Sequence, residues 1–198
     1  MAAIGITGGI ATGKTAFTLL LRELLPAATF FDADIAAREL TEHDLEARAL
    51  IAEAFGRDIY SAEGHLKRAE LRAIVFADPG RKQALEQILH PRIRRQWALE
   101  AERRRHSTEL FLADIPLLYE TGGEALCDRV VVVACSPRVQ LERLMARSSL
   151  DPAAAEQMIA AQMPLTAKIA RAHHVAWNNG APALLREQAE TLAAVWRP

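Results

Sequence analysis

The sequence predicts an α/β fold in which a parallel sheet of five strands is flanked by helices. Short apolar segments alternate with longer amphipathic segments along the 198 residues. The segment at 129–134 is a continuous β-branched run, which is typical of a parallel strand buried on both faces. A glycine-rich turn joins the first apolar segment to the first helical one, which is the order of a strand, a loop and a helix in one unit.

In the first half of the chain, a strand is predicted at residues 2–6 and a helix at 16–25. The helix offers Leu19, Leu20 and Leu24 to the core. A second strand at 29–31 ends at an acidic pair. Residues 35–105 then follow a helical pattern, whose breaks are Gly56, Gly64 and the turn Asp78-Pro79-Gly80.

In the second half, a third strand at 109–113 ends at Asp114, and the β-branched strand follows at 129–134. Ser136-Pro137 opens a helical region that continues to 171, because proline suits the first turn of a helix. A fifth strand is predicted at 174–177 and a last helix at 182–196. The predicted apolar face of that helix consists of Leu184, Leu185, Leu192 and Val195.

The run from Gly8 to Thr15 fits the spacing Gly-x-x-x-x-Gly-Lys-[Ser/Thr], the phosphate-binding loop (P-loop) of nucleoside-triphosphate-binding folds. Its glycines let backbone N–H groups turn inward, and the helix that follows adds the partial positive charge of its N-terminus. Lys14 can then reach the β- and γ-phosphates, and the Thr15 hydroxyl can ligate Mg²⁺. The alternative is a glycine turn with an incidental lysine, but the full spacing in this context predicts a nucleoside triphosphate site.

Composition agrees with a compact enzyme. Hydrophobic residues make up 51% of the chain and charged residues 25%, which excludes a disordered protein. A net charge of −1 gives no sign of a nucleic-acid partner, and the run Arg103-Arg104-Arg105 has the alternative of a solvated helix face. Cys127 and Cys135 suggest neither a disulfide framework nor a metal cluster. With no apolar run long enough for a membrane span and no room for a signal peptide, we expect no membrane partner and a cytoplasmic location.

The acidic pair Asp32 and Asp34, followed by Arg38, lies at the carboxyl end of the second strand, where open α/β sheets bind their ligands. Residues one apart in an extended segment point to opposite faces, so one carboxylate can face a metal and its water and the other an acceptor hydroxyl. The alternative is that they cap a helix starting near Ile35. The two interpretations are compatible, and spacing leaves both open.

These motifs together resemble the dephospho-CoA kinase family. The resemblance spans nearly the whole chain and is carried by the phosphate loop, the acidic pair with Arg38, His90-Pro91, the stretch 114–120 and Asn179-Gly180. It implies ATP-dependent phosphorylation of the ribose 3′-hydroxyl of dephospho-coenzyme A, with Mg²⁺ as cofactor and a monomeric enzyme favoured. It also implies a nucleotide-binding core at 1–34, 106–142 and 172–198, an acceptor-binding insertion at 35–105 and a lid at 143–171.

Site residues follow from the resemblance by position. Asp34 is implied as the catalytic base, and Asp32 as the carboxylate that orients Mg²⁺-bound water or Lys14, with the metal also held by Thr15. The nucleotide phosphates are assigned to Gly8, Gly9, Ala11, Thr12, Gly13, Lys14, Thr15 and Ala16. The acceptor is assigned to Asp32, Asp34, Arg38, His90, Pro91, Leu117, Leu118 and Glu120. Without the resemblance, the histidine before proline would be a helix-end or packing residue, and the two leucines would be core.

The lid carries Arg147, which the resemblance places on the transferring phosphoryl group, where its planar fork can hold two phosphate oxygens. Arg143 falls on the same helical face and either assists or forms a salt bridge. Gln162 and Lys168 match further lid positions. Asn179 and Gly180 match the adenine-binding turn, for which an ordinary Asn-Gly turn is the alternative.

The chain departs from the family pattern at three places. Ala11 and Thr12 stand where the family has Gly-Ser, and we expect the loop to form with a negative φ at Ala11. His173 replaces the usual aspartate before the fifth strand, and residues 147–150 lack an acidic residue. The rival functions are another small-molecule or nucleoside monophosphate kinase, and a nucleotide-dependent switch. The switch is disfavoured because Asp114-Ile115-Pro116-Leu117 lacks the glycine of an Asp-x-x-Gly element.

Overall fold

A computed structural model describes residues 3–104, 107 and 109–197. The chain divides into two compact units. One is built from the chain up to Phe31 and from Glu100 onward, and the other is Asp32–Leu99. Arg105 of the arginine run lies outside the described residues, as does Ala2 of the first predicted strand.

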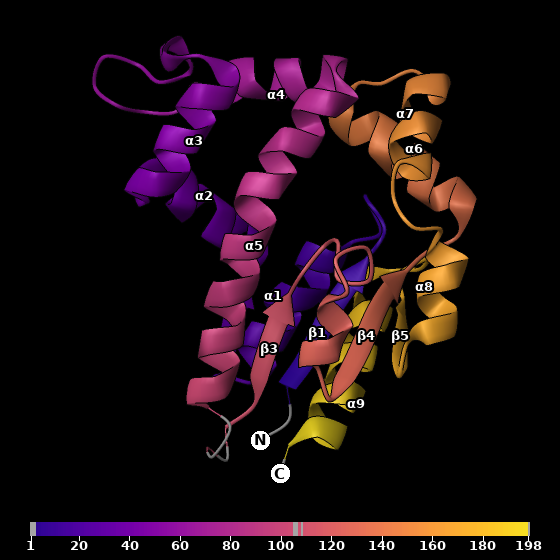
Figure 1. Ribbon diagram of the computed structural model, residues 1–198. Coiled ribbons are helices and arrows are strands. Elements are labelled where there is room, and N and C mark those ends of the chain that lie inside the picture. The colour runs from indigo at the N-terminus through magenta and orange to yellow at the C-terminus, as the bar shows by residue number, and fades with distance from the viewer. Residues whose placement is uncertain (1–2, 105–106, 108, 198) are drawn as a thin grey trace. The chain divides into compact units, whose positions relative to one another are not determined.

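The first unit is organised by a five-stranded sheet in the order β2-β3-β1-β4-β5, of which Figure 1 labels β3, β1, β4 and β5. The central strand β1 pairs in parallel with β3 and with β4, and β4 pairs in parallel with β5. The strands are β1 Ala3–Gly8, β2 Thr29–Asp32, β3 Phe111–Asp114, β4 Arg129–Ala134 and β5 His174–Trp177. The predicted fold class is confirmed. β1 ends two residues later than predicted, β2 and β3 each end one residue later, and β3 starts two residues later.

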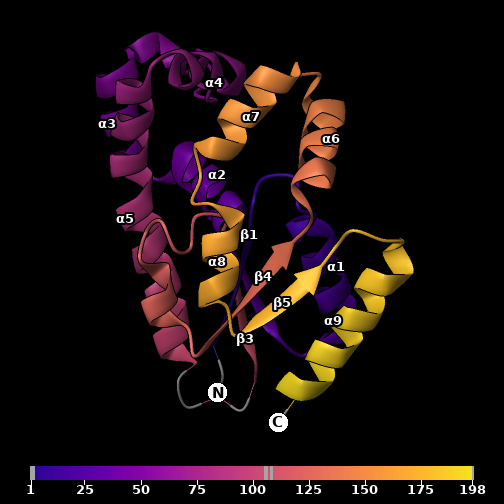
Figure 2. The same ribbon diagram turned by 90° about the vertical axis from the view of Figure 1, so that its right-hand side faces the viewer.

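Helices cover both faces of this sheet, with α1 and α9 on one face and α8 on the other (Figures 1 and 2). Ser136 caps α6 by accepting a hydrogen bond from the N–H of Val139, which confirms the predicted start of that helix. The elements are α1 Lys14–Leu24, the 3₁₀ turn η2 Gly123–Leu126, α6 Pro137–Ser148, α7 Pro152–Ala160, α8 Leu165–Arg171 and α9 Pro182–Trp196.

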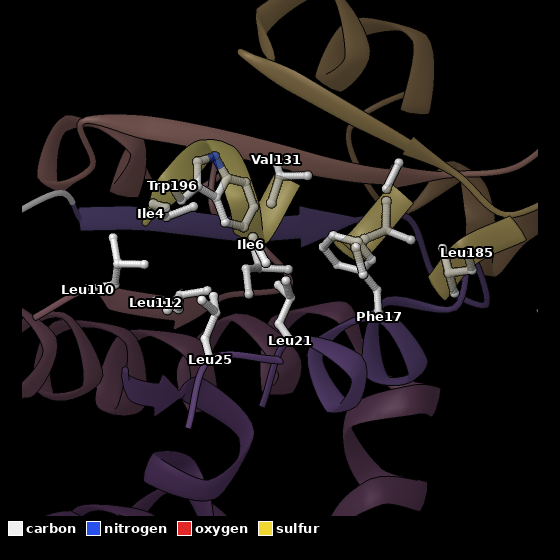
Figure 3. Close-up of a cluster of buried hydrophobic side chains, with 14 residues drawn as sticks. Ile4, Ile6, Phe17, Leu21, Leu25, Leu110, Leu112, Val131, Leu185 and Trp196 are labelled. Atoms are coloured by element: carbon white, nitrogen blue, oxygen red, sulfur yellow. The ribbon is translucent and has the colours of Figure 1, made fainter. Parts of the chain in front are cut away.

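The main core lies between the sheet and the pair α1 and α9 (Figure 3). Alternate residues of β1, Ile4 and Ile6, face Phe17 and Leu21 of α1, which are one helical turn apart. All four side chains are fully buried. Because burial of this kind stabilises by about 25 cal/mol per Å² of apolar area, this layer holds β1 and α1 at the two ends of the phosphate loop.

Two predicted apolar faces are wrong in part. Leu19 is 56% exposed, because α1 begins at Lys14 and turns Phe17 and Leu21 toward the sheet. On α9, Leu184 and Val195 are 51% and 62% exposed. The buried stripe of α9 is instead Leu185, Ala189, Ala193 and Trp196, which belong to the core that α9 shares with α1 and the sheet.

The second unit is helical, and its small core is Ile51, Ile59, Leu66 and Leu71. Gly56 and Gly64 have φ of 95° and 86°, so the predicted breaks fall at left-handed backbone positions. The third predicted break is also confirmed, since α4 ends before Asp78 and α5 begins at Pro79. The elements are α2 Ala33–His43, α3 Leu45–Phe55, the 3₁₀ turn η1 Arg57–Ile59, α4 Arg68–Ala77 and α5 Pro79–Arg103.

The described part of the arginine run lies at the end of α5 and just after it. Arg103 is 71% exposed and pairs with Glu100. Arg104 also pairs with Glu100 and donates from Nε to Thr29 Oγ1 at 3.1 Å. The solvated-face interpretation therefore describes Arg103, whereas Arg104 ties the helix end to the start of β2. In the described part of the chain, no helix combines the length and apolarity needed to cross a membrane.

Candidate active site

The phosphate loop connects β1 to α1, and two of its glycines are required by geometry. Gly13 has φ of 95°, and a Cβ there would lie 2.0 Å from Nδ2 of Asn178. A Cβ on Gly8 would lie 2.6 Å from the carbonyl oxygen of Val133 on β4. At both positions a larger residue would displace a neighbour, so the motif glycines bring the loop close to the edge of the sheet.

Ala11 corrects a prediction from the sequence. Its φ is 60°, in the left-handed region, and not negative as we expected. A left-handed conformation costs a residue with a Cβ about 1–2 kcal/mol, which the rest of the loop must offset. The adjacent Thr12 is fully buried and donates from Oγ1 to the carbonyl of Gly9 at 2.9 Å. The departure from the family pattern is therefore accommodated by strain at Ala11 beside a well-anchored Thr12.

Three side chains from other elements hold the backbone of the loop. Oε1 of Gln162 accepts from the N–H of Ile10, and Nε2 of Gln140 donates to the carbonyl of Ile10, both at 2.8 Å. Nδ2 of Asn178 donates to the carbonyl of Thr12 at 2.9 Å. Sequence reasoning assigned Gln162 only to the lid, and it missed Gln140 and Asn178 because a neutral amide carries no motif by itself.

The ammonium of Lys14 forms an ion pair with Asp114, the last residue of β3. Both side chains are largely buried, at 15% and 6% exposure. The other carboxylate oxygen of Asp114 accepts from Oγ1 of Thr18 at 2.8 Å. Asp114 is thus the residue that aims Lys14 within this unit. The signal for it was present in the sequence, since it ends a strand at the edge where ligands bind.

Four of the residues that the resemblance assigns to the nucleotide lie on α6 and in the turn after β5. Nη1 of Arg143 is buried and has no hydrogen-bond partner among the described residues. A buried guanidinium N–H without a partner is costly, which makes this Nη1 a candidate donor for a bound ligand. Arg147 is exposed in the last turn of α6. Oδ1 of Asn179 accepts from the N–H of Ser136 at 2.7 Å, which ties the turn after β5, with the exposed Gly180, to the start of α6.

The predicted acceptor residues after β3 differ in burial and in their contacts. Leu118 is fully buried, with Cδ2 2.9 Å from where a Cβ on Gly5 would lie, so the core interpretation holds for it. Leu117 is half-buried. Glu120 forms an ion pair with Lys168 and accepts from the N–H of Met163. Contact of these residues with an acceptor stays a prediction.

In the second unit, Asp32 is the N-cap of α2. Its Oδ1 accepts from the N–H groups of Asp34 and Ile35 at 2.9 and 3.0 Å, which confirms the capping interpretation. We had expected both aspartates to lie in one extended segment. The helix begins at Ala33, so only Asp32 is extended and Asp34 is helical. Asp34 and Arg38 are both exposed and lie one turn apart on α2.

His90 and Pro91 lie inside α5, not at a helix end. His90 is half-buried and Pro91 is exposed. Proline inside a helix removes one backbone hydrogen bond, and the helix continues through it to Arg103. Their assignment to the acceptor stays a prediction.

The comparison with known proteins agrees with the loop geometry. A sequence profile of the family described as dephospho-CoA kinase matches residues 2–183. The chain belongs to the dephospho-CoA kinase family. A dephospho-CoA kinase of Anaeromyxobacter dehalogenans is 46% identical over 197 residues, covering 98% of this chain and 92% of that protein. One from Bacillus cereus is 38% identical over 194 residues, covering 98% and 96%.

Solved structures share the fold. A protein of Thermus thermophilus superposes with a TM-score of 0.76 at 32% identity, over 100% of this chain and 98% of that one. The dephospho-CoA kinase of Campylobacter jejuni superposes with a TM-score of 0.75 at 24% identity, over 98% and 96%. The architecture of a P-loop kinase is therefore shared along the whole length of the chain.

One departure from the dephospho-CoA kinase pattern now has a structural account. His173 donates its backbone N–H to the carbonyl of Val130 at 3.0 Å, and its Nδ1 accepts from the N–H of Val130 at 3.1 Å. The imidazole thus supplies a hydrogen-bond acceptor where the family pattern has a carboxylate. The break in the pattern at 147–150 coincides with the end of α6 at Ser148 and its C-cap Ser149, and Asp151 then caps α7.

The side chains near the loop fit Mg²⁺ bound together with a nucleotide. No group of three or more His, Cys, Asp or Glu side chains that could hold a metal occurs in the parts of the chain that are described. Mg²⁺ bound with a nucleotide takes most of its ligands from phosphates and water, and needs only one or two from the protein. The hydroxyl of Thr15, exposed in the first turn of α1, fits as such a protein ligand.

The cysteines give no nucleophile for a covalent intermediate. Burial, together with the charges of Asp128 and Glu124, raises the pKa of Cys127 to about 12. Burial also raises the pKa of Cys135, which is only 1% exposed. Since the thiolate is the reactive form, both groups are inert near neutral pH.

Proposed function

We propose that this protein transfers the γ-phosphoryl group of ATP to the ribose 3′-hydroxyl of dephospho-coenzyme A, giving coenzyme A and ADP. Membership of the dephospho-CoA kinase family supports the reaction. The observation that carries the proposal is the geometry of the phosphate loop. Asp114, at the end of β3, holds the ammonium of Lys14, the first residue of α1. There the helix N-terminus and the lysine provide positive charge for the phosphates.

The transfer is in-line, with no covalent enzyme intermediate. The acceptor oxygen attacks the γ-phosphorus, the bond to the bridging oxygen breaks, and ADP leaves with the electron pair. We assign Asp34 as the base that takes the proton of the hydroxyl, because it is an exposed carboxylate in the first turn of α2. Arg143, whose Nη1 lacks a partner among the described residues, and Arg147 stabilise the charge that develops on the equatorial oxygens.

Mg²⁺ fits the chemistry of this site. We infer that Thr15 would hold it directly and that Asp32 would act through a bound water. When bound, Mg²⁺ neutralises charge on the β- and γ-phosphates. Asp32 already accepts two backbone N–H groups as the N-cap of α2, which holds its carboxylate in one orientation.

The second unit supplies the acceptor side in this proposal. The candidate contacts of the acceptor are Arg38, His90 and Pro91, with Leu117 from the turn after β3. The part of the predicted lid (143–171) that precedes α8, residues 143–164, would close over the nucleotide and exclude water, since α8 packs against β4. Asn179 and Gly180 would hold the adenine. We infer further that the enzyme works in the cytoplasm as a monomer and needs neither nucleic acid nor a membrane.

ATP consumption measured with Mg²⁺, with and without dephospho-CoA, tests the reaction. We expect ADP formation that depends on the acceptor, and a matching gain of one phosphate on dephospho-CoA by mass spectrometry. Lys14→Ala should abolish both ATP use and transfer. Hydrolysis that is independent of the acceptor would contradict the proposal and favour a nucleotide-dependent switch. Transfer to another hydroxyl compound would favour a different small-molecule kinase.

A further inference from the structure

A buried cation lies directly beneath the phosphate loop. Lys168 of α8 is fully buried, with 0% of its side chain exposed. Its ammonium donates to the carbonyl of Gly8 at 3.1 Å and to the carbonyl of Pro116 at 3.2 Å. It also forms an ion pair with Oε1 of Glu120 at 2.8 Å. All three donor positions of the ammonium are thereby used, which is what a buried charge requires.

The three acceptors belong to the two segments that flank the Lys14–Asp114 ion pair. Gly8 is the last residue of β1 and opens the phosphate loop that leads to Lys14. Pro116 and Glu120 belong to the turn that starts after Asp114, the last residue of β3. Oγ1 of Thr7 also donates to the carbonyl of Pro116, at 3.0 Å. Lys168 therefore links the first residue of the phosphate loop to the turn that follows β3.

Glu120 contacts the same chain segment that carries Lys168. The oxygen that pairs with Lys168 also accepts from the N–H of Met163 at 3.0 Å. Gln162, the preceding residue, holds the N–H of Ile10 in the loop. The chain from Gln162 to Lys168 thus contacts the loop at two points and the Glu120 side chain at two more. The side chain of Glu120 is 22% exposed, and its charge is compensated by a cation whose side chain is fully buried.

We propose that Lys168 and Glu120 are positioning residues for ATP binding, and that Glu120 acts through Lys168 without touching the acceptor. This inference rests on the proposed function and changes the role that the family resemblance implies for Glu120. Loss of the ammonium would free the Gly8 carbonyl and let the loop shift relative to the Asp114 turn. Lys14 would then lose its alignment with the phosphates, so that the first effect of the change is on the nucleotide.

The variants are Lys168→Met, which keeps the length of the side chain without its charge, and Glu120→Gln, which keeps an acceptor oxygen. Glu124→Gln is the matched control, because Glu124 pairs with Arg171 one turn further along α8. The readouts are the Kd for Mg-ATP without acceptor, the KM for dephospho-CoA at saturating ATP, kcat and the melting temperature. The conservative glutamine variant remains informative if the methionine variant does not fold.

We expect Lys168→Met to weaken ATP binding by about tenfold or more and Glu120→Gln by about threefold to tenfold. The KM for dephospho-CoA should stay within about twofold in every variant, and Glu124→Gln should bind ATP like the parent protein. A rise in the KM for dephospho-CoA in Glu120→Gln, with unchanged ATP affinity, would overturn the inference by placing Glu120 on the acceptor. A lower melting temperature with unchanged ATP affinity would reduce both residues to a purely structural role.

The two proposals fail in different ways. If the parent protein binds ATP but does not phosphorylate dephospho-CoA, the proposed function is wrong, while the ATP affinities of the variants still decide the role of Lys168. If the parent protein turns over dephospho-CoA and the variants bind ATP normally, the reaction stands and the positioning role is wrong.

Discussion

Replacing Gly13 by alanine should destabilise the protein in a way that depends on Asn178. Gly13 has φ of 95° and ψ of 21°, and a Cβ there would lie 2.0 Å from Nδ2 of Asn178. The left-handed backbone costs about 1–2 kcal/mol once a Cβ is present. The clash must also displace the Asn178 amide, which breaks its hydrogen bond to the buried carbonyl of Thr12 at a cost of about 1–3 kcal/mol. Together, Gly13→Ala should lower the free energy of unfolding by about 2–5 kcal/mol.

A double-mutant cycle separates the two contributions. Asn178→Ala alone loses the same hydrogen bond and should cost about 1–3 kcal/mol. In the double variant the amide is already gone, so Gly13→Ala should add only the backbone cost of about 1–2 kcal/mol. The two changes should therefore be less than additive, by about the 1–3 kcal/mol of the shared hydrogen bond.

Urea denaturation followed by tryptophan fluorescence measures this coupling, because Trp196 reports on the core of the first unit. ATP affinity should fall along with stability in Gly13→Ala, since the loop itself is displaced. Additive free energies within about 0.3 kcal/mol would refute the reasoning, because they would mean that the alanine and the Asn178 amide do not compete for the same space.

Substitutions at three other residues have expected outcomes of their own. Asp34→Asn should leave ATP affinity unchanged and lower kcat by roughly 10²-fold, the loss expected for a general base; near-normal turnover would show that another group takes the proton. Ala11→Gly relieves the left-handed strain but adds entropy to the unfolded chain, so urea denaturation should show a change between zero and about 1 kcal/mol of stabilisation, and a destabilisation would contradict the φ of 60°. Burial, with smaller contributions from Arg129 and His173, lowers the pKa of His174 below its usual value of 6.5. The unfolded chain then binds more protons below about pH 6.5, so stability falls as pH falls through that range, and His174→Gln should show a shallower decline between pH 7.5 and 5.5.

Local signals predicted the secondary structure well. The strand at 129–134 was evident from four consecutive valines, and the start of α6 from Ser136 and Pro137. The faces of the helices were less predictable. Leu19 and Val195 looked like core residues, but whether a leucine or valine is buried depends on the element that packs against it. On α9 the buried positions include Ala189 and Ala193, which belong to the core that this helix shares with α1 and the sheet.

The candidate site was also predictable only where the signal is local. The spacing of Gly8, Gly13, Lys14 and Thr15 was sufficient to predict a phosphate loop, because the motif is contiguous and each residue has a local task. The backbone of Ala11 was predicted wrongly, because the sign of its φ depends on contacts of the whole loop and not on the residue itself.

The fold class, the nucleotide loop and the family resemblance could all be read from the amino-acid sequence, since they depend on short-range periodicity and contiguous motifs. The distant residues that complete the site are brought together only by tertiary contacts. Lys14 pairs with Asp114, a hundred residues away, and Lys168 reaches Gly8 across a separation of 160 residues. Such contacts are set by strand order and register, which bring β1 beside β3 and place α8 against β4. A lone lysine or aspartate carries no sign of its partner until the sheet has formed.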